Sequence, residues 1–235
     1  MAIYKVESDA AWAKIDANNL TLNNMKFLLD KMSEIIIERE VEFCELDSHA
    51  GDGDFGMSIA KGFRQIKKEW ADLTRPEVTT FGEFLRGCSM IIMEHCGGAS
   101  GPIWGAAFRA AGVATRDKES LTTVEFAEMI QAAIKGIQKT GERAFGRGAV
   151  VGDKTLIDAL VPCADVWTSE AAKGTDFVTI FKLGAEAAVI GAESTKDVVA
   201  KMGRAGAVGD RSLGHPDAGA TGLGIIFTEL AKSLT

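Results

Sequence analysis

The chain turns at Leu46–Phe63, whose sequence is LDSHAGDGDFGMSIAKGF. Apolar residues recur at helical spacing on both sides of this stretch, so it is predicted to join two helices. Its carboxylates, Asp47, Asp52 and Asp54, alternate with glycines that permit a tight turn. Carboxylates this close repel one another unless a cation neutralises them, and hard divalent ions prefer oxygen ligands. The backbone N–H groups that open the next helix favour an anion. Together they predict a Mg²⁺–phosphate site; the alternative is a solvated turn in which Asp54 caps a helix.

Apolar residues recur at helical spacing along the rest of the chain as well. Evidence for strands is weak, because no Asn-Gly or Asp-Gly pair is flanked by alternating apolar residues. The sequence shows no linker and no internal repeat. We therefore predict an all-α fold in a single domain that covers residues 1–235. The expected helices cover 9–20, 21–46, 56–70, 80–95, 103–113, 122–140, a segment beginning near 154, 176–192, 194–202 and 220–234.

Composition limits the class of protein. The 235 residues are 46% hydrophobic and 25% charged, which suits one globular domain with a sizeable core. The net charge of −7 argues against a nucleic-acid surface. The N-terminal residues 1–16 lack the apolar segment of a signal peptide, and no run approaches the roughly 20 apolar residues of a membrane span. The expected location is cytoplasmic. The cysteines contain no Cys-x-x-Cys pair and are predicted to be reduced thiols: Cys44, Cys88, Cys96 and Cys163.

Four glycine-rich loops carry the polar chemistry, and the aspartate turn is loop 1 (46–55). Loop 2 (96–101) has the sequence CGGASG, which can present N–H groups and a hydroxyl to a phosphate, although such turns are more often simply flexible. Loop 3 (141–155) ends in Gly-Asp-Lys-Thr, where we interpret Lys154 as a solvated side chain. Loop 4 (203–220) is unusually long for a compact domain, which favours a binding loop, and its Arg204 suits phosphate contacts.

The motifs in these loops occur in order along nearly the whole chain. They are LDSHAGDGDFG, GGASGP, GDKTLIDAL and GRAGAVGDRSLGHPDAGA. Together they resemble the signatures of the DhaL family, the nucleotide-binding L subunit of dihydroxyacetone kinase. The resemblance implies a barrel of about eight antiparallel amphipathic helices, with the nucleotide bound at one end.

The resemblance also implies the ligands. Asp47, Asp52 and Asp54 would hold two Mg²⁺ ions against the phosphates of ADP or ATP. No side chain of this chain, including its three histidines, is expected to be a catalytic base, because the substrate arrives on a partner. The nucleotide-binding residues implied are Phe55, Gly56, Met57, Ser58, Gly98, Ala99, Ser100, Gly148, Leu156, Arg204, Asp217, Ala218 and Gly219.

The implied partner is a K subunit that carries dihydroxyacetone, or a similar short ketose, on a histidine. In one version of the family an M-type phosphoprotein of the phosphotransferase system rephosphorylates the bound nucleotide. In the other version ATP exchanges, and the L-type sequence is fused to K. Because this chain contains no K-like portion, the phosphotransferase-system version is favoured. A homodimer is left open.

Three positions depart from the family pattern. Phe55 stands where His is usual, Ser58 replaces Asn, and Ala218 replaces Pro in loop 4. Phe55 removes a polar contact near the phosphates, which bears on transfer more than on binding. Two alternatives therefore stay open: the L subunit of an ATP-dependent kinase for another short ketose, and a nucleotide-sensing regulatory partner without turnover.

Overall fold

The computed structural model describes residues 8–234, and these are mostly helical, which confirms the predicted all-α class. The first seven residues, part of the stretch predicted not to be a signal peptide, lie outside the described residues. Two short helices, α2 (Glu40–Ser48) and α4 (Trp70–Leu73), accompany eight longer ones. The longer helices are α1 (Leu22–Glu38), α3 (Phe55–Lys68), α5 (Phe81–His95), α6 (Ser100–Ala114), α7 (Thr123–Phe145), α8 (Ile157–Ala172), α9 (Phe177–Ser194) and α10 (Ala218–Ser233).

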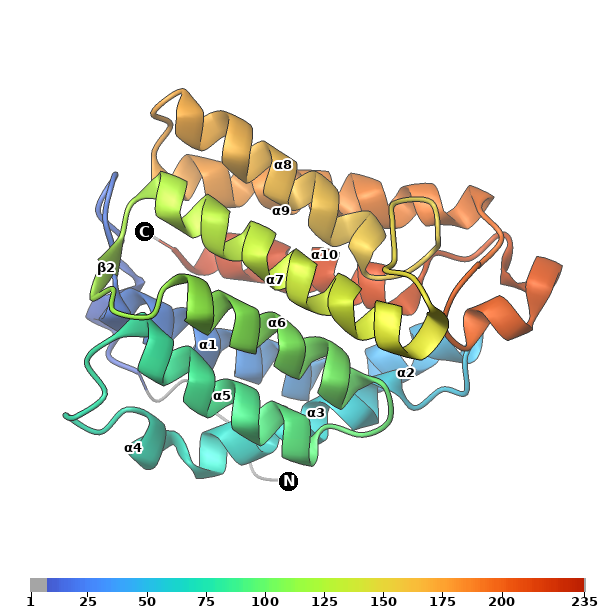
Figure 1. Cartoon of the computed structure of the whole chain (residues 1–235), viewed down its shortest axis with the longest axis horizontal. Coiled ribbons are helices and arrows are strands. Elements are labelled where there is room, and N and C mark those ends of the chain that lie inside the picture. The colour runs from blue at the N-terminus through green and yellow to red at the C-terminus, as the bar shows by residue number, and fades with distance from the viewer. Residues whose placement is uncertain (1–7, 235) are drawn as a thin grey trace.

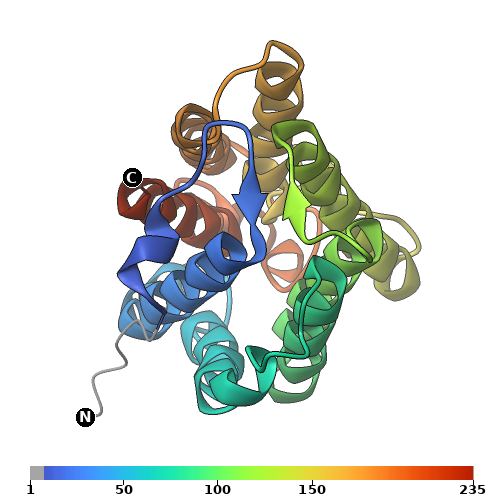
Figure 2. The same cartoon turned by 90° about the vertical axis from the view of Figure 1, so that its left-hand side faces the viewer.

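The eight longer helices form a closed ring. Each packs on the next in the order α1, α3, α5, α6, α7, α8, α9 and α10, and α10 packs back on α1. Figure 1 shows the helices lying across the picture in alternating directions, and Figure 2 shows the ring nearly end-on. This confirms the expected barrel of about eight antiparallel helices. One consequence matters for the site: α3, α6, α8 and α10 all begin at the same end of the barrel.

The four helices that begin at the opposite end start with side-chain caps. Thr21, Thr80 and Thr122 form capping boxes at the starts of α1, α5 and α7, and Asp176 accepts a hydrogen bond from the Thr179 N–H in α9. Such caps satisfy backbone N–H groups that a helix leaves unpaired. The short strands β1 (Leu20–Thr21) and β2 (Ser120–Leu121) pair antiparallel next to the caps of α1 and α7. This end is closed by the chain's own groups.

Four predicted boundaries are wrong. The expected helix 9–20 is only a 3-10 turn at Ala10–Ala13, because the Asn24 amide donates to two carbonyls at its end, those of Trp12 (2.8 Å) and Lys14 (2.9 Å). The expected helix 21–46 breaks at Arg39 into α1 and α2. Helix α7 runs five residues beyond 140, to Phe145, before Gly146 ends it with φ of 76°. The expected helix 194–202 shrinks to the 3-10 turn Thr195–Asp197.

The barrel interior is apolar and holds a cavity of about 190 Å³. Aromatic rings from three helices pack on one another along its wall, among them Phe126, Trp167 and Phe181.

The four cysteines are free thiols, as predicted, and all but Cys44 are buried. None of the helices in residues 8–234 is both long and apolar enough to cross a bilayer.

Candidate functional site

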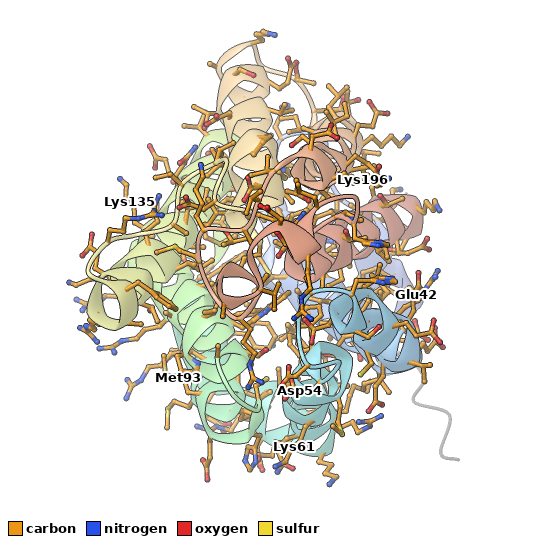
Figure 3. All side chains as sticks on the ribbon, turned by 90° about the vertical axis from the view of Figure 1, so that its right-hand side faces the viewer. Glu42, Asp54, Lys61, Met93, Lys135 and Lys196 are labelled. Atoms are coloured by element: carbon orange, nitrogen blue, oxygen red, sulfur yellow. The ribbon has the colours of Figure 1, made fainter. Side chains whose placement is uncertain are left out.

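All four loops lie at the end of the barrel where α3, α6, α8 and α10 begin. They surround a pocket of about 200 Å³. Figure 3 looks onto this end, with Asp54 labelled. The structure thus brings together residues that are up to 172 positions apart in the sequence, from Asp47 to Gly219. The predicted residues that line the pocket are Asp47, Asp52, Asp54, Phe55, Ser58, Gly98, Ala99, Ser100, Leu156, Arg204, Asp217, Ala218 and Gly219.

Three other predicted residues lie outside this pocket wall. Gly56 faces α2, where an added Cβ would lie 1.9 Å from the Glu40 carbonyl oxygen, so it serves close helix packing. Met57 points outward and is 57% exposed. Gly148 packs on α7, where an added Cβ would lie 3.0 Å from the Gln138 side chain.

The three aspartates of loop 1 converge. Asp47, Asp52 and Asp54 each offer a carboxylate oxygen, and these oxygens lie within 4.8 Å of one another. Asp47 Oδ2 accepts the N–H groups of Gly53 (2.9 Å) and Asp54 (3.2 Å), which folds the turn over it. Ligands on opposite sides of one Mg²⁺ lie about 4.2 Å apart, so this donor set can hold a hard divalent cation after a small inward shift of the carboxylates. The capping alternative for Asp54 is not realised, because its side chain makes no cap hydrogen bond to α3.

Four helix N-termini meet at the same pocket, since Asp54, Ala99, Leu156 and Asp217 are the N-cap residues of α3, α6, α8 and α10. Only Asp217 makes a side-chain cap; the other three N-cap residues make none. The opposite end of the barrel shows the reverse pattern, with a cap on every helix. Helix N-termini carry partial positive charge, which favours an anion at this end. Two of the first-turn N–H groups are already paired, that of Ile157 in α8 with Thr155 Oγ1 (3.2 Å) and that of Met57 in α3 with Cys44 Sγ (3.3 Å).

Loop 4 reaches across the pocket to loop 1. The Arg204 guanidinium pairs with the Asp52 carboxylate, although both side chains are partly exposed. Beside this pair, the rings of His49 and His215 stack with their centroids 4.1 Å apart and their planes within 5° of parallel. Arg204 is therefore held beside the three carboxylates, at the place where phosphates bound to a cation would lie.

Comparison with known proteins decides the family. The sequence profile of the DAK2 domain matches residues 49–232. The chain belongs to the DAK2 domain family. It is 32% identical over 202 residues to the "PEP-dependent dihydroxyacetone kinase 2, ADP-binding subunit DhaL" of Listeria innocua, covering 85% of this chain and 89% of that subunit.

Other DAK2 relatives are longer proteins. The chain is 31% identical to the D-erythrulose kinase of Mycolicibacterium smegmatis, covering 88% of this chain but only 34% of that kinase. The fold resembles that of the dihydroxyacetone kinase from C. freundii, solved in complex with AMP-PNP and Mg²⁺. The TM-score is 0.63 at 23% identity, over 88% of this chain and 33% of that one. The chain thus matches nearly the whole length of an ADP-binding subunit and about a third of the length of these longer kinases.

In this DAK2 domain the prediction that Lys154 is a solvated side chain is wrong. Lys154 is 2% exposed and its ammonium donates to three backbone carbonyls. Its neighbours Asp153 and Asp158 are equally buried. Asp158 accepts the N–H groups of Gly152 (2.6 Å) and Thr155 (2.7 Å). The Gly-Asp-Lys-Thr motif is therefore a buried polar scaffold beneath the pocket, a role that sequence spacing does not reveal.

Asp217 combines a structural and a chemical role in the DAK2 pocket. Its carboxylate caps α10 by accepting the Ala220 N–H at 2.8 Å. Burial raises the pKa of Asp217 to about 7, the Ala220 N–H lowers it, and the nearby Asp158 raises it further. A carboxyl group with this pKa changes charge near neutral pH, beside the place where an anion is expected.

Phe55, the departure from the family pattern, is a partly buried packing residue as well as part of the pocket wall. Its ring stacks on that of Phe43 with centroids 5.8 Å apart. It also lies against Gly222 of α10, where an added Cβ would be 3.2 Å from the ring.

The pocket wall further includes residues that the motifs did not single out, among them Ile103, Trp104 and Met202. Ile103 and Trp104, together with Leu156, also line the apolar cavity of the barrel, so they separate it from the pocket.

Proposed function

We propose that this chain is a nucleotide-binding phosphotransferase subunit. It passes a phosphoryl group from a Mg²⁺-bound ATP/ADP coenzyme to dihydroxyacetone, or a similar short ketose, held on a partner K subunit. One observation carries the proposal: three carboxylates face the same pocket as three helix N-termini whose N-cap residues make no side-chain cap. A cation and a polyanion are needed together to satisfy both groups, and a Mg²⁺–nucleotide supplies them.

The acidic residues of the pocket would bind the metal, and the helix N-termini and Arg204 would bind the phosphates. Asp47, Asp52 and Asp54 would hold Mg²⁺, and the resemblance to the DhaL family implies two ions. When bound, the metal neutralises the charge that develops on the transferring phosphoryl group. The N-termini of α3 and α6 orient the phosphates, and Arg204 adds a cation on the side of loop 4.

The remaining functional expectations concern partners. The similarity to stand-alone ADP-binding subunits supports a separate K subunit and an M-type phosphoprotein as the phosphoryl donor. The similarity to erythrulose kinases supports a second candidate, the L component of an ATP-dependent kinase for a four-carbon ketose. A third candidate is a nucleotide-sensing regulatory partner without turnover, because Phe55 removes a polar contact near the phosphates. The proposed location is cytoplasmic, where such partners act.

Calorimetry of the purified chain with ADP, with and without Mg²⁺, tests the proposal directly. We expect binding only when Mg²⁺ is present, and ligand at a hundred times its dissociation constant stabilises the native state by about 2.7 kcal/mol. No Mg²⁺-dependent binding would rule the proposal out. Adding a K subunit, a ketose and either ATP or phosphorylated M subunit then separates the candidates, because the regulatory partner alone gives no ketose phosphate with any donor.

Replacing Phe55 by His is expected to separate binding from transfer. The dissociation constant for Mg²⁺–ADP should stay within about tenfold of the wild-type value, roughly 1.4 kcal/mol. The aspartates would bind the metal and the backbone N–H groups the phosphates, and neither is changed. The transfer rate or the donor preference should change, since a side chain next to the phosphates affects their alignment with the acceptor. Single-turnover assays with both donors measure this. Phe43→Leu is the matched control, because it disturbs the same ring stack without placing a polar group at the phosphates. Equal transfer rates with every donor and ketose would show that Phe55 is a packing residue only.

A further inference from the structure

We propose that Lys154 is a positioning residue of the nucleotide site. Its ammonium joins the two ends of the segment 195–217, which lie side by side and are called the neck below. By joining them it holds Arg204 where that side chain meets loop 1. The inference rests on the proposed function for its consequence, but the cross-link itself is a feature of the protein without ligand.

The contacts of Lys154 define the neck. Its Nζ donates to the carbonyl oxygens of Thr195 (2.7 Å), Val198 (3.1 Å) and His215 (2.7 Å). The first two begin the segment and the third ends it. An ammonium has three N–H donors, so these carbonyls occupy all of them. Lys154 therefore acts as a cross-link between the two ends of the segment, although it also borders the pocket.

These contacts also explain why the expected helix 194–202 does not form. In an α-helix the carbonyls of Thr195 and Val198 would accept N–H groups four residues later. Here the ammonium donates to both, the Thr195 carbonyl accepts the Val198 N–H of a 3-10 turn as well, and the chain turns to extended backbone at Val198. The hydroxyl of Thr195 supports the same neck by accepting the Asp217 N–H at 2.7 Å.

The backbone of loop 3 is shaped to aim this side chain. Among residues 8–234, Lys154 is the only residue other than glycine with positive φ, at 62°. Such a conformation persists where the surroundings determine it. The surroundings do so on both sides: Arg147 donates to Asp153 (3.0 Å), and Asp158 accepts two N–H groups of the loop.

The segment beyond the neck depends on it. Two hydrogen bonds cross the segment, from the Ala200 N–H to Ser212 Oγ (2.9 Å) and from the Gly214 N–H to the Lys196 carbonyl (2.9 Å). Loop 3 holds the segment at a second point, because the Lys201 N–H donates to the Asp153 carbonyl (3.1 Å) next to Lys154. Its Arg204 side chain is 62% exposed and meets loop 1 through the ion pair with Asp52. Loosening the neck therefore shifts Arg204, and the N–H donors removed with Lys154 are ones that the three backbone carbonyls already occupy.

Replacing Lys154 by Met tests the proposal, because Met keeps the apolar stem and removes all three donors. In the ligand-free protein, hydrogen exchange should quicken in residues 196–216 while the middle of α5 stays protected. Affinity for Mg²⁺–ADP should fall about tenfold or more, since a displaced contact loses its alignment. Lys26→Met, which removes another buried lysine in the second turn of α1, is the matched control and should leave both readouts unchanged.

A double-mutant cycle distinguishes positioning from general stability. If Lys154 acts through the segment, Arg204→Ala should weaken Mg²⁺–ADP binding much less in the Lys154→Met background than in the wild type. Additive losses, or unchanged exchange in 196–216, overturn the proposal. If Lys154→Met does not fold, Lys154→Gln, which keeps two N–H donors, takes its place with the same expectations. A wild-type protein that does not bind Mg²⁺–ADP contradicts the proposed function instead, while the exchange result still decides the role of Lys154.

Discussion

Replacing Asp54 by Asn is expected to raise the dissociation constant for Mg²⁺–ADP more than about a hundredfold, roughly 2.7 kcal/mol. Asp54 is the cleanest of the three carboxylates to test. Asp47 also accepts two N–H groups that fold loop 1, and Asp52 is paired with Arg204. The Asp54 side chain makes no cap to α3, so its removal takes away a cation ligand and little else. Titration calorimetry at saturating Mg²⁺ measures the change.

The ligand-free Asp54→Asn protein should be at least as stable as the wild type. Removing one of three clustered negative charges relieves repulsion, and no native hydrogen bond of that side chain is lost. Asp72→Asn, an exposed carboxylate on α4, is the matched control and should leave both affinity and melting temperature unchanged. Undiminished Mg²⁺–ADP affinity in Asp54→Asn would contradict the assignment of loop 1 to the metal.

Replacing Lys67 by Met is expected to cost the largest share of stability, about 3 kcal/mol. Lys67 and Asp30 form an ion pair in which the side chains are 2% and 0% exposed. The ammonium also lies 5.6 Å from the centre of the Trp70 ring. Removing it leaves the Asp30 charge buried without this partner, although Ser8 still donates to that carboxylate. At roughly 2–4 °C per kcal/mol for a protein of this size, the melting temperature should fall by about 10 °C.

The neighbouring Lys68 supplies the control, because it is exposed on the same helix and Lys68→Met should change the melting temperature little. The double variant Asp30→Leu, Lys67→Met should recover most of the loss, since replacing a whole buried pair by apolar groups is often neutral. A loss in Lys68→Met as large as that in Lys67→Met would show that the buried pair is not the cause.

Helical periodicity and motif chemistry determined much of this protein. The spacing of apolar residues predicted the helices, because a helix must bury one face whatever it packs against. Thr21 and Thr122 were recognisable as caps because a cap needs only groups three residues apart. Loop 1 was recognisable as a candidate cation site because its three aspartates and its glycines lie within eight positions of one another.

What only the tertiary structure decided depends on groups far apart in the chain. Lys154 looks like a solvated residue in its local sequence, yet carbonyls 41, 44 and 61 positions away bury and bind its ammonium. The same contacts cancel the helix predicted at 194–202. Asp30 and Lys67, 37 positions apart, meet only because α1 packs on α3. The end that carries the candidate site arises likewise from topology, because a ring of antiparallel helices gathers the starts of alternate helices at one place. Periodicity reports which face of a helix is buried, but it carries no information about which distant donors and acceptors will meet there.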